Sequence, residues 1–106
     1  MQSLTMPAGS PAQAAFIMDG DYMEPYIRPG QVVTVTWRLP AIGECGIFRY
    51  QGETLVRQYC EDSFQNIYLL TLNRTRQELD VTVPAGSELL CLGRLELEKT
   101  PPLPVM

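Results

Sequence analysis

Short apolar runs separated by turn residues recur along the sequence from residue 14 onward. In several runs apolar and polar residues alternate, as in strands with one buried face. Val33, Val35 and Trp37, for example, lie on the same side of their run. This pattern predicts seven strands, at residues 14–18, 31–37, 46–50, 54–60, 66–72, 79–83 and 88–97. The alternation also predicts that Trp37 is largely buried.

Residues that set turn dihedrals stand between these runs. Gln51-Gly52 suits a two-residue hairpin turn, and further turns are expected at residues 28–30, 40–43, 73–76 and 84–86. Residues 22–27 are the only candidate helical piece, because Pro25 could open one turn there. We therefore expect an all-β fold with a twisted, partly closed sheet and at most one short helical turn.

The two ends of the sequence differ in composition from the middle. Residues 1–13 combine small residues with prolines and show no period, which is typical of a linker or an N-terminal arm. Residues 98–106 contain Pro101, Pro102 and Pro104 and should form an extended C-terminal tail. The remaining residues, 14–97, fit a single small domain.

The charge balance argues against direct binding of nucleic acid. The formal net charge is −4 and the sequence pI is about 4.6, so the domain as a whole repels phosphates. Seven arginines are scattered along the chain, and only Arg74 and Arg76 come close together, as a solvated loop pair would. The N-terminus lacks the charged stretch followed by an apolar stretch that marks a signal peptide, and no apolar run is long enough to span a membrane. We therefore expect a cytoplasmic protein without a membrane partner.

Few residues are available for catalysis or for metal binding. The chain has no histidine, and its single lysine, Lys99, lies in the proline-rich tail. Its three cysteines form no C-x-x-C pair and should be reduced, buried thiols, as in the cytoplasm. The acidic group Asp19, Asp21 and Glu24 forms no complete ligand loop, so we expect neither a metal nor a cofactor.

One segment carries a recognisable motif, Asp19-Gly20-Asp21-Tyr22-Met23-Glu24-Pro25, with Pro29-Gly30-Gln31-Val32-Val33 shortly after it. It resembles the G-D-S-M-E-P and G-D-x-V signature of LexA-like repressor peptidases, whose core S-M-x-P also occurs in signal peptidases. Residues 43–48, 52–59, 70–73 and 90–97 are similar to later strands of that family, in the family's order. The resemblance implies a LexA or signal peptidase-like fold for residues 15–97.

The sequence departs from this family at both catalytic positions. The resemblance places Tyr22 at the nucleophilic serine and Arg57 at the lysine base. An arginine cannot give up its proton in a protein, and the tyrosine oxygen reaches well beyond a serine hydroxyl. We therefore expect no catalytic residue, but an inactive homologue in which Tyr22 and Arg57 lie side by side and hold structure. Ala8-Gly9 matches the family's self-cleavage bond in letters, although it lies unusually close to residue 22.

The resemblance implies a regulatory and dimerisation domain of a transcriptional regulator. DNA would be contacted only through a helix-turn-helix domain that is not in this chain. The last predicted strand is apolar on both alternations, which favours a homodimer, although the N-terminal arm could cover it instead. Two other functions stay open: a ligand sensor with a cleft lined by Tyr22, Trp37 and Tyr59, and a self-cleaving peptidase using carboxylates such as Asp19 and Asp21.

Overall fold

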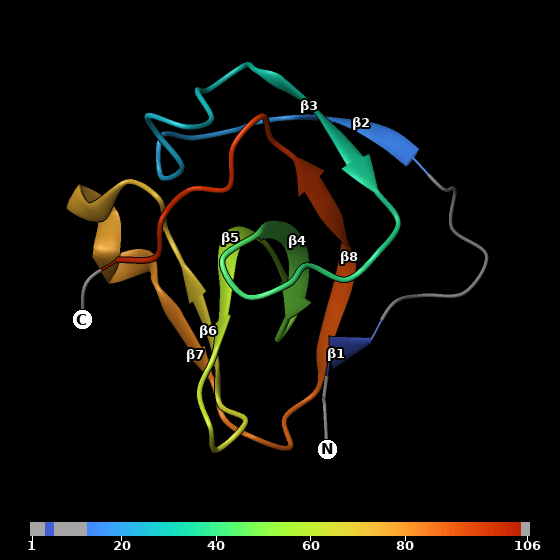
Figure 1. The fold of residues 1–106 in the computed structure, drawn as a ribbon, viewed down its shortest axis with the longest axis vertical. Coiled ribbons are helices and arrows are strands. Elements are labelled where there is room, and N and C mark those ends of the chain that lie inside the picture. The colour runs from blue at the N-terminus through green and yellow to red at the C-terminus, as the bar shows by residue number, and fades with distance from the viewer. Residues whose placement is uncertain (1–3, 6–12, 105–106) are drawn as a thin grey trace.

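The computed structural model describes residues 4–5 and 13–104, which form one curved sheet (Figure 1). The strand order is β2-β3-β8-β4-β5-β6-β7, all antiparallel, and β1 adds to β8 in parallel. The sheet does not close into a barrel. The strands are β1 Leu4–Thr5, β2 Gln13–Ile17, β3 Val32–Thr36, β4 Cys45–Tyr50, β5 Glu53–Glu61, β6 Ile67–Leu70, β7 Val81–Val83 and β8 Leu89–Glu96.

The all-β prediction is confirmed, and each of the seven predicted strands has a counterpart within a few residues of its expected ends. The helical content lies elsewhere than expected. Residues 22–27 form turns in which the N–H groups of Tyr26 and Ile27 both donate to the Met23 carbonyl oxygen. The segment expected to be a turn at 73–76 instead opens the 3-10 helix η1, Arg74–Leu79, which the Asn73 side chain caps.

The hairpin between β4 and β5 confirms the expected turn at Gln51-Gly52. Both residues have positive φ angles, 51° and 81°, and the strands pair from Tyr50 and Glu53 onward. Two consecutive positive φ angles define a type I′ turn, whose twist matches that of antiparallel strands. This turn fixes the register of β5 and therefore decides which β5 side chains point inward.

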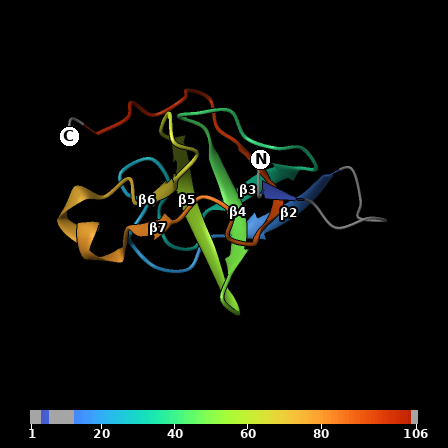
Figure 2. The same cartoon turned by 90° about the horizontal axis from the view of Figure 1, so that it is seen from below.

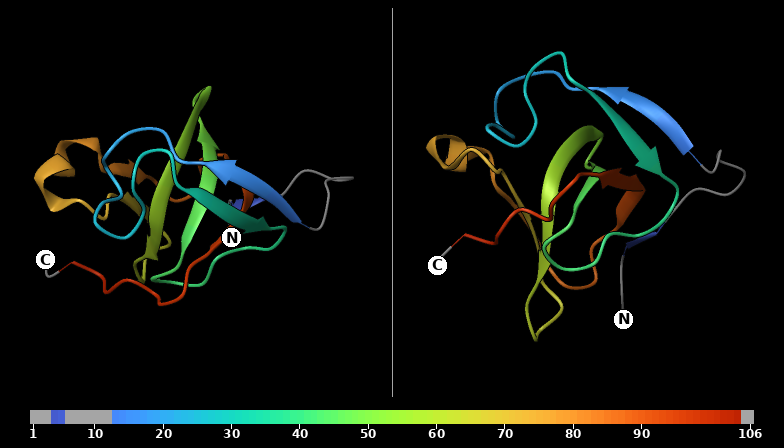
Figure 3. Two further views of the ribbon diagram at one scale, coloured as in Figure 1. Left: turned by 90° about the horizontal axis from the view of Figure 1, so that it is seen from above. Right: turned by 45° about the horizontal axis from the view of Figure 1, so that its top comes forward.

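Strand β8 lies between β3 and β4 and changes partners along one of its edges. It pairs with β4 from Leu90 to Arg94. On its other edge, Leu89 and Leu90 pair with β1, and residues 94–96 pair with β3. The register with β4 shifts between Ile47 and Phe48, which leaves Leu92 as an extra residue in β8. The sheet is strongly twisted there, and the β2–β3 pair crosses the β4–β5 pair steeply (Figures 2 and 3).

The buried side chains form two clusters on either side of this twist. The first joins β3 and β8 to the loop after β2, through residues such as Met18, Met23 and Val35. The second joins β5, β6 and β7 to Phe48 of β4 and to Leu89 and Cys91 of β8. Trp37 lies one residue beyond the end of β3 and is mostly, though not fully, buried, which agrees with the prediction that it is largely buried.

The two expected terminal segments both contact the domain. Within the presumed arm, β1 pairs with Leu89 and Leu90 of β8. In the tail, Pro101 is buried against the domain. Across residues 4–5 and 13–104, no helix has the length and apolar character that crossing a membrane requires.

Candidate functional site

The motif segment around Tyr22 is a loop fixed at both ends and in its middle. Two backbone hydrogen bonds join its ends. The N–H of Met18 donates to the Gln31 carbonyl oxygen at 2.9 Å, and the N–H of Gly30 donates to the Met18 carbonyl oxygen at 2.8 Å. Asn73 holds the middle, because its backbone N–H donates to the Tyr22 carbonyl oxygen at 2.9 Å and its Nδ2 to that of Asp21 at 3.0 Å. The backbone of Tyr22 therefore has a defined place beside η1.

Arg57 approaches Tyr22 from β5. Its side chain is almost fully buried, and its Cζ atom lies 4.5 Å from the centroid of the Tyr22 ring. At this distance the positive guanidinium is attracted to the face of the ring. The prediction that Tyr22 and Arg57 lie side by side is confirmed.

The other donors of Arg57 are used to hold backbone. Its Nε donates to the Leu79 carbonyl oxygen, at the end of η1, at 3.2 Å, and its Nη1 donates to the Val56 carbonyl oxygen at 2.9 Å. Burial lowers the pKa of Arg57, and the nearby Tyr22, Asp80 and Glu53 act in the opposite direction. The guanidinium thus ties β5, η1 and the motif loop together.

A second arginine, Arg74, closes this region through Asp80. Its Nη1 and Nη2 donate to Asp80 Oδ1 and Oδ2 at 3.0 and 2.9 Å, a two-pronged contact that fixes both side chains. Asp80 Oδ1 also accepts from the backbone N–H of the fully buried Thr71, at 2.8 Å. Arg76 Nη1 lies 3.5 Å from Asp21 Oδ1, and the side chains of Arg74 and Arg76 stay 37% and 42% exposed, in agreement with the interpretation of these two residues as a solvated loop pair.

The remaining motif residues shape the loop around Tyr22. A side chain on Gly20 would bring its Cβ within 2.9 Å of the Tyr22 ring, and the φ of Gly20 is 95°, so both space and backbone favour glycine there. Met23 is fully buried in the first cluster. Glu24 is half-buried beside Pro25, at a shallow opening that Arg28 and Asn73 also line.

The acidic residues of the motif do not assemble a metal site. Asp19 is exposed, and the half-buried Asp21 carboxylate faces Arg76. In the part of the chain that the structure describes, no three carboxylate or thiol side chains gather closely enough to hold a metal ion. The contacts of Asp21 therefore orient the loop rather than a ligand.

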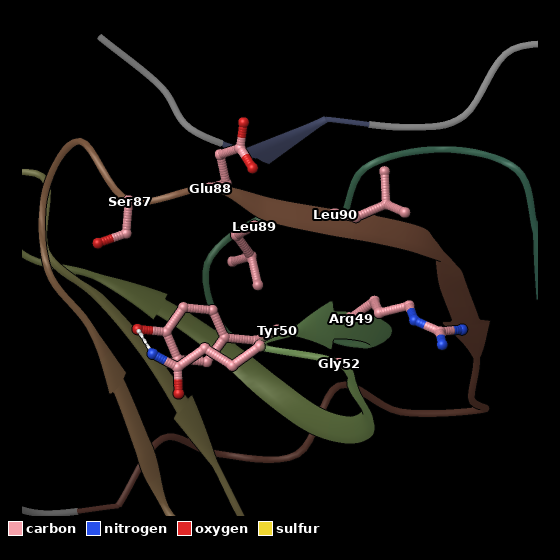
Figure 4. A pocket seen from close by; sticks show the side chains of 8 residues that line it. Arg49, Tyr50, Gly52, Ser87, Glu88, Leu89 and Leu90 are labelled. Atoms are coloured by element: carbon pink, nitrogen blue, oxygen red, sulfur yellow. Dashed lines mark hydrogen bonds between the residues drawn. The ribbon is translucent and has the colours of Figure 1, made fainter.

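A larger pocket of about 780 Å³ lies away from this site, between the β4–β5 hairpin and the start of β8 (Figure 4). Ser87 lines it together with Arg49, Tyr50 and Glu88, but no hydrogen bond joins Ser87 to a base within the described residues. Ser63 is exposed on the β5–β6 turn. Ser3, Ser10 and the Ala8-Gly9 bond lie outside the described residues.

The three aromatic residues proposed to line a ligand cleft separate into different surroundings. Tyr59 stacks on Phe48 in the second cluster, with ring centroids 6.2 Å apart. Tyr22 packs on the first cluster, and Trp37 lies past the end of β3. The pocket in Figure 4 is lined by none of them.

The cysteines differ in accessibility. Cys45 and Cys91 are buried, and burial raises the pKa of the first to about 12 and of the second to about 11. Cys60 is half-buried on β5. The expectation of buried thiols is confirmed for Cys45 and Cys91, which behave as small apolar core residues.

A thiol reagent should therefore label the native protein at Cys60 alone. Modification requires an accessible thiolate, which Cys45 and Cys91 do not offer, so they should react at least about 100-fold more slowly. Mass spectrometry during labelling measures this, with Cys60→Ser as the control that should remain unlabelled until denaturant is added. Rapid labelling of Cys45 in the folded Cys60→Ser variant would contradict the core described above.

Comparisons with protein-family models and with curated proteins find no match to this chain. Function must therefore be argued from the site. Sequence reasoning brought Tyr22 and Arg57 together, but it missed Thr71, Asp80 and the Leu79 carbonyl oxygen, which complete the region. Nothing in the local sequence marks these partners, because they lie 9 to 22 residues from the groups they bind.

Proposed function

We propose that this chain is a non-catalytic regulatory and dimerisation domain of a LexA-like transcriptional regulator. The observation that carries the proposal is the stack of Arg57 on Tyr22, 4.5 Å apart. These residues occupy the positions at which the resemblance expects a base and a nucleophile. A buried guanidinium that donates to two backbone carbonyl oxygens supports structure and cannot accept a proton.

The sequence offers little to replace the lost base, since it contains no histidine. Its single lysine, Lys99, is exposed and follows β8, whereas a catalytic lysine must be desolvated to be neutral near pH 7. The proposed self-cleaving alternative with Asp19 and Asp21 would need two facing carboxylates, but Asp21 faces Arg76 instead. These contacts favour a role in assembly over a role in chemistry.

A dimerisation domain serves a DNA-binding regulator by pairing two helix-turn-helix domains. Operators with two half-sites require two such domains at a fixed separation, which a two-fold dimer supplies. Leu90 of β8 is only half-buried and could contribute apolar area to the contact. The net charge of −4 fits a domain that does not touch DNA itself.

The direct test joins this chain to a helix-turn-helix domain that represses a reporter only as a dimer. We expect the fusion to repress. The variant Phe48→Asp, which places a carboxylate in the core, should abolish repression, whereas Phe64→Asp, at a side chain that is 79% exposed, should not. A well-expressed fusion that does not repress would rule out the proposed dimerisation.

A further inference from the structure

A buried amide on β5 holds the proline-rich tail against the domain. Gln58 is fully buried, on the alternation opposite to Arg57. Its Nε2 donates to the Gly43 carbonyl oxygen at 2.9 Å and to the Pro101 carbonyl oxygen at 2.8 Å, and it lies 3.4 Å from the Pro102 carbonyl oxygen. The tail is therefore bound through a specific side chain at its buried residue, Pro101.

The tail continues from Pro101 along a groove beside η1. Pro102, Leu103 and Pro104 lie over a hollow of about 340 Å³, whose domain side includes Tyr26 and Leu72. In Figure 1 the tail runs from the end of β8 across the molecule toward η1. The groove thus combines an amide donor at one end with apolar and aromatic surface along the rest.

This combination suits an extended proline-rich segment. Proline has no N–H, so its carbonyl oxygen is the only backbone group that can be hydrogen-bonded, and Gln58 supplies the donor for it. Proline-rich segments are also extended before they bind, so less conformational entropy is lost on docking. Pro101 and Pro102 therefore suit the groove because each offers a carbonyl oxygen and an already extended backbone.

We propose that the groove also binds the tail of a second copy of this chain, so that two copies exchange tails and form a dimer. The connecting residues 98–100 are exposed, and a change of backbone direction there would redirect the tail without altering its contacts in the groove. The chain's own tail shows which segment fits the groove. This inference rests on the proposed function for the existence of the dimer, and it assigns the element that holds the dimer together.

The single lysine makes a decisive experiment possible on the intact protein. Cleavage by a lysine-specific protease after the exposed Lys99 severs residues 100–106 from the domain at one site. Sedimentation before and after cleavage then reports the effect of the tail's covalent link. We expect a dimer before cleavage and a folded monomer after it, since exchanged tails no longer connect the two domains.

A labelled synthetic peptide with the sequence of residues 100–106 tests recognition by the groove. It should bind the cleaved domain after the severed tail is washed out, and a peptide with alanine at its three prolines should bind at least about tenfold more weakly. On the domain side, Gln58→Glu removes the donor and should weaken binding by at least about tenfold. Gln77→Glu, at an exposed position, makes the same chemical change and should not weaken binding.

The possible failures are distinguishable. A dimer that persists after cleavage would overturn tail exchange and leave the proposed dimerisation domain intact. A chain that is monomeric before cleavage would contradict dimerisation itself, and the exchange with it. Equal binding of the proline and alanine peptides would overturn the assigned recognition, and this result does not depend on any protein variant remaining folded.

Discussion

The variant Arg57→Ala should lower the free energy of unfolding by about 2–4 kcal/mol. The substitution removes the donors to the Leu79 and Val56 carbonyl oxygens and leaves both without that partner in a buried place. It also removes the cation from the face of the Tyr22 ring and opens a cavity between β5 and η1. Urea denaturation followed by circular dichroism measures the loss.

Arg49→Ala is the matched control, because Arg49 lies on the neighbouring strand β4 but is exposed. Its effect should stay within about 0.5 kcal/mol, as for most surface substitutions. The loss of unfolding free energy in Arg57→Lys should lie between the losses in Arg57→Ala and Arg49→Ala. Lysine keeps the charge, but it lacks the planar guanidinium that donates to both carbonyl oxygens. Equal losses for Arg57→Ala and Arg49→Ala would show that Arg57 does not hold the region together.

The variant Gly93→Ala should lower the free energy of unfolding by at least about 3 kcal/mol. Gly93 lies in β8 close to β3, and a Cβ there would fall 2.5 Å from Val35 Cγ1 and 3.0 Å from the Thr36 carbonyl oxygen. Its φ of 148° adds strain for any other residue. Strands β3 and β8 would have to move apart there.

Gly86→Ala separates the steric clash from the backbone strain. Gly86 has a φ of 85°, but a Cβ there would meet nothing within 4 Å. It should therefore cost only about 1–2 kcal/mol, the usual penalty for a left-handed residue. If Gly93→Ala is no more harmful than Gly86→Ala in thermal and urea unfolding, the close approach of β3 to β8 is not as described.

The strands could be predicted from the sequence because alternation and turn residues are local signals. The register of the β4–β5 hairpin follows from Gln51-Gly52 alone. The helix η1 could not be predicted, because its segment contains no apolar stripe and none of its residues is buried. Trp37 continues the alternation one residue past the end of β3 and is mostly buried there.

The site could be predicted only in part. The resemblance placed Tyr22 and Arg57 together, and their contact agrees with that alignment. The roles of Asp80 and Gln58 depend on partners brought near by the fold, such as Thr71 and Pro101, which have no sequence signature. A buried glutamine and a proline-rich tail look unrelated in the sequence because 43 residues separate Gln58 from Pro101.

We propose that the Tyr22 and Arg57 pair holds structure and does not catalyse peptide cleavage. Reverting the pair by Tyr22→Ser together with Arg57→Lys should restore some cleavage only when a cleavable Ala-Gly segment is supplied, because a desolvated lysine can then act as base. A second pair of variants tests the unmodified site. Tyr22→Phe removes the phenol oxygen of Tyr22, and Tyr26→Phe, at an exposed tyrosine of the same loop, is its matched control.

The most direct measurement is mass spectrometry of the intact protein, incubated alone and with such a peptide at mildly alkaline pH. We predict that neither the chain nor the peptide is cleaved. Cleavage by the unmodified protein that Tyr22→Phe abolishes and Tyr26→Phe leaves unchanged would contradict the account.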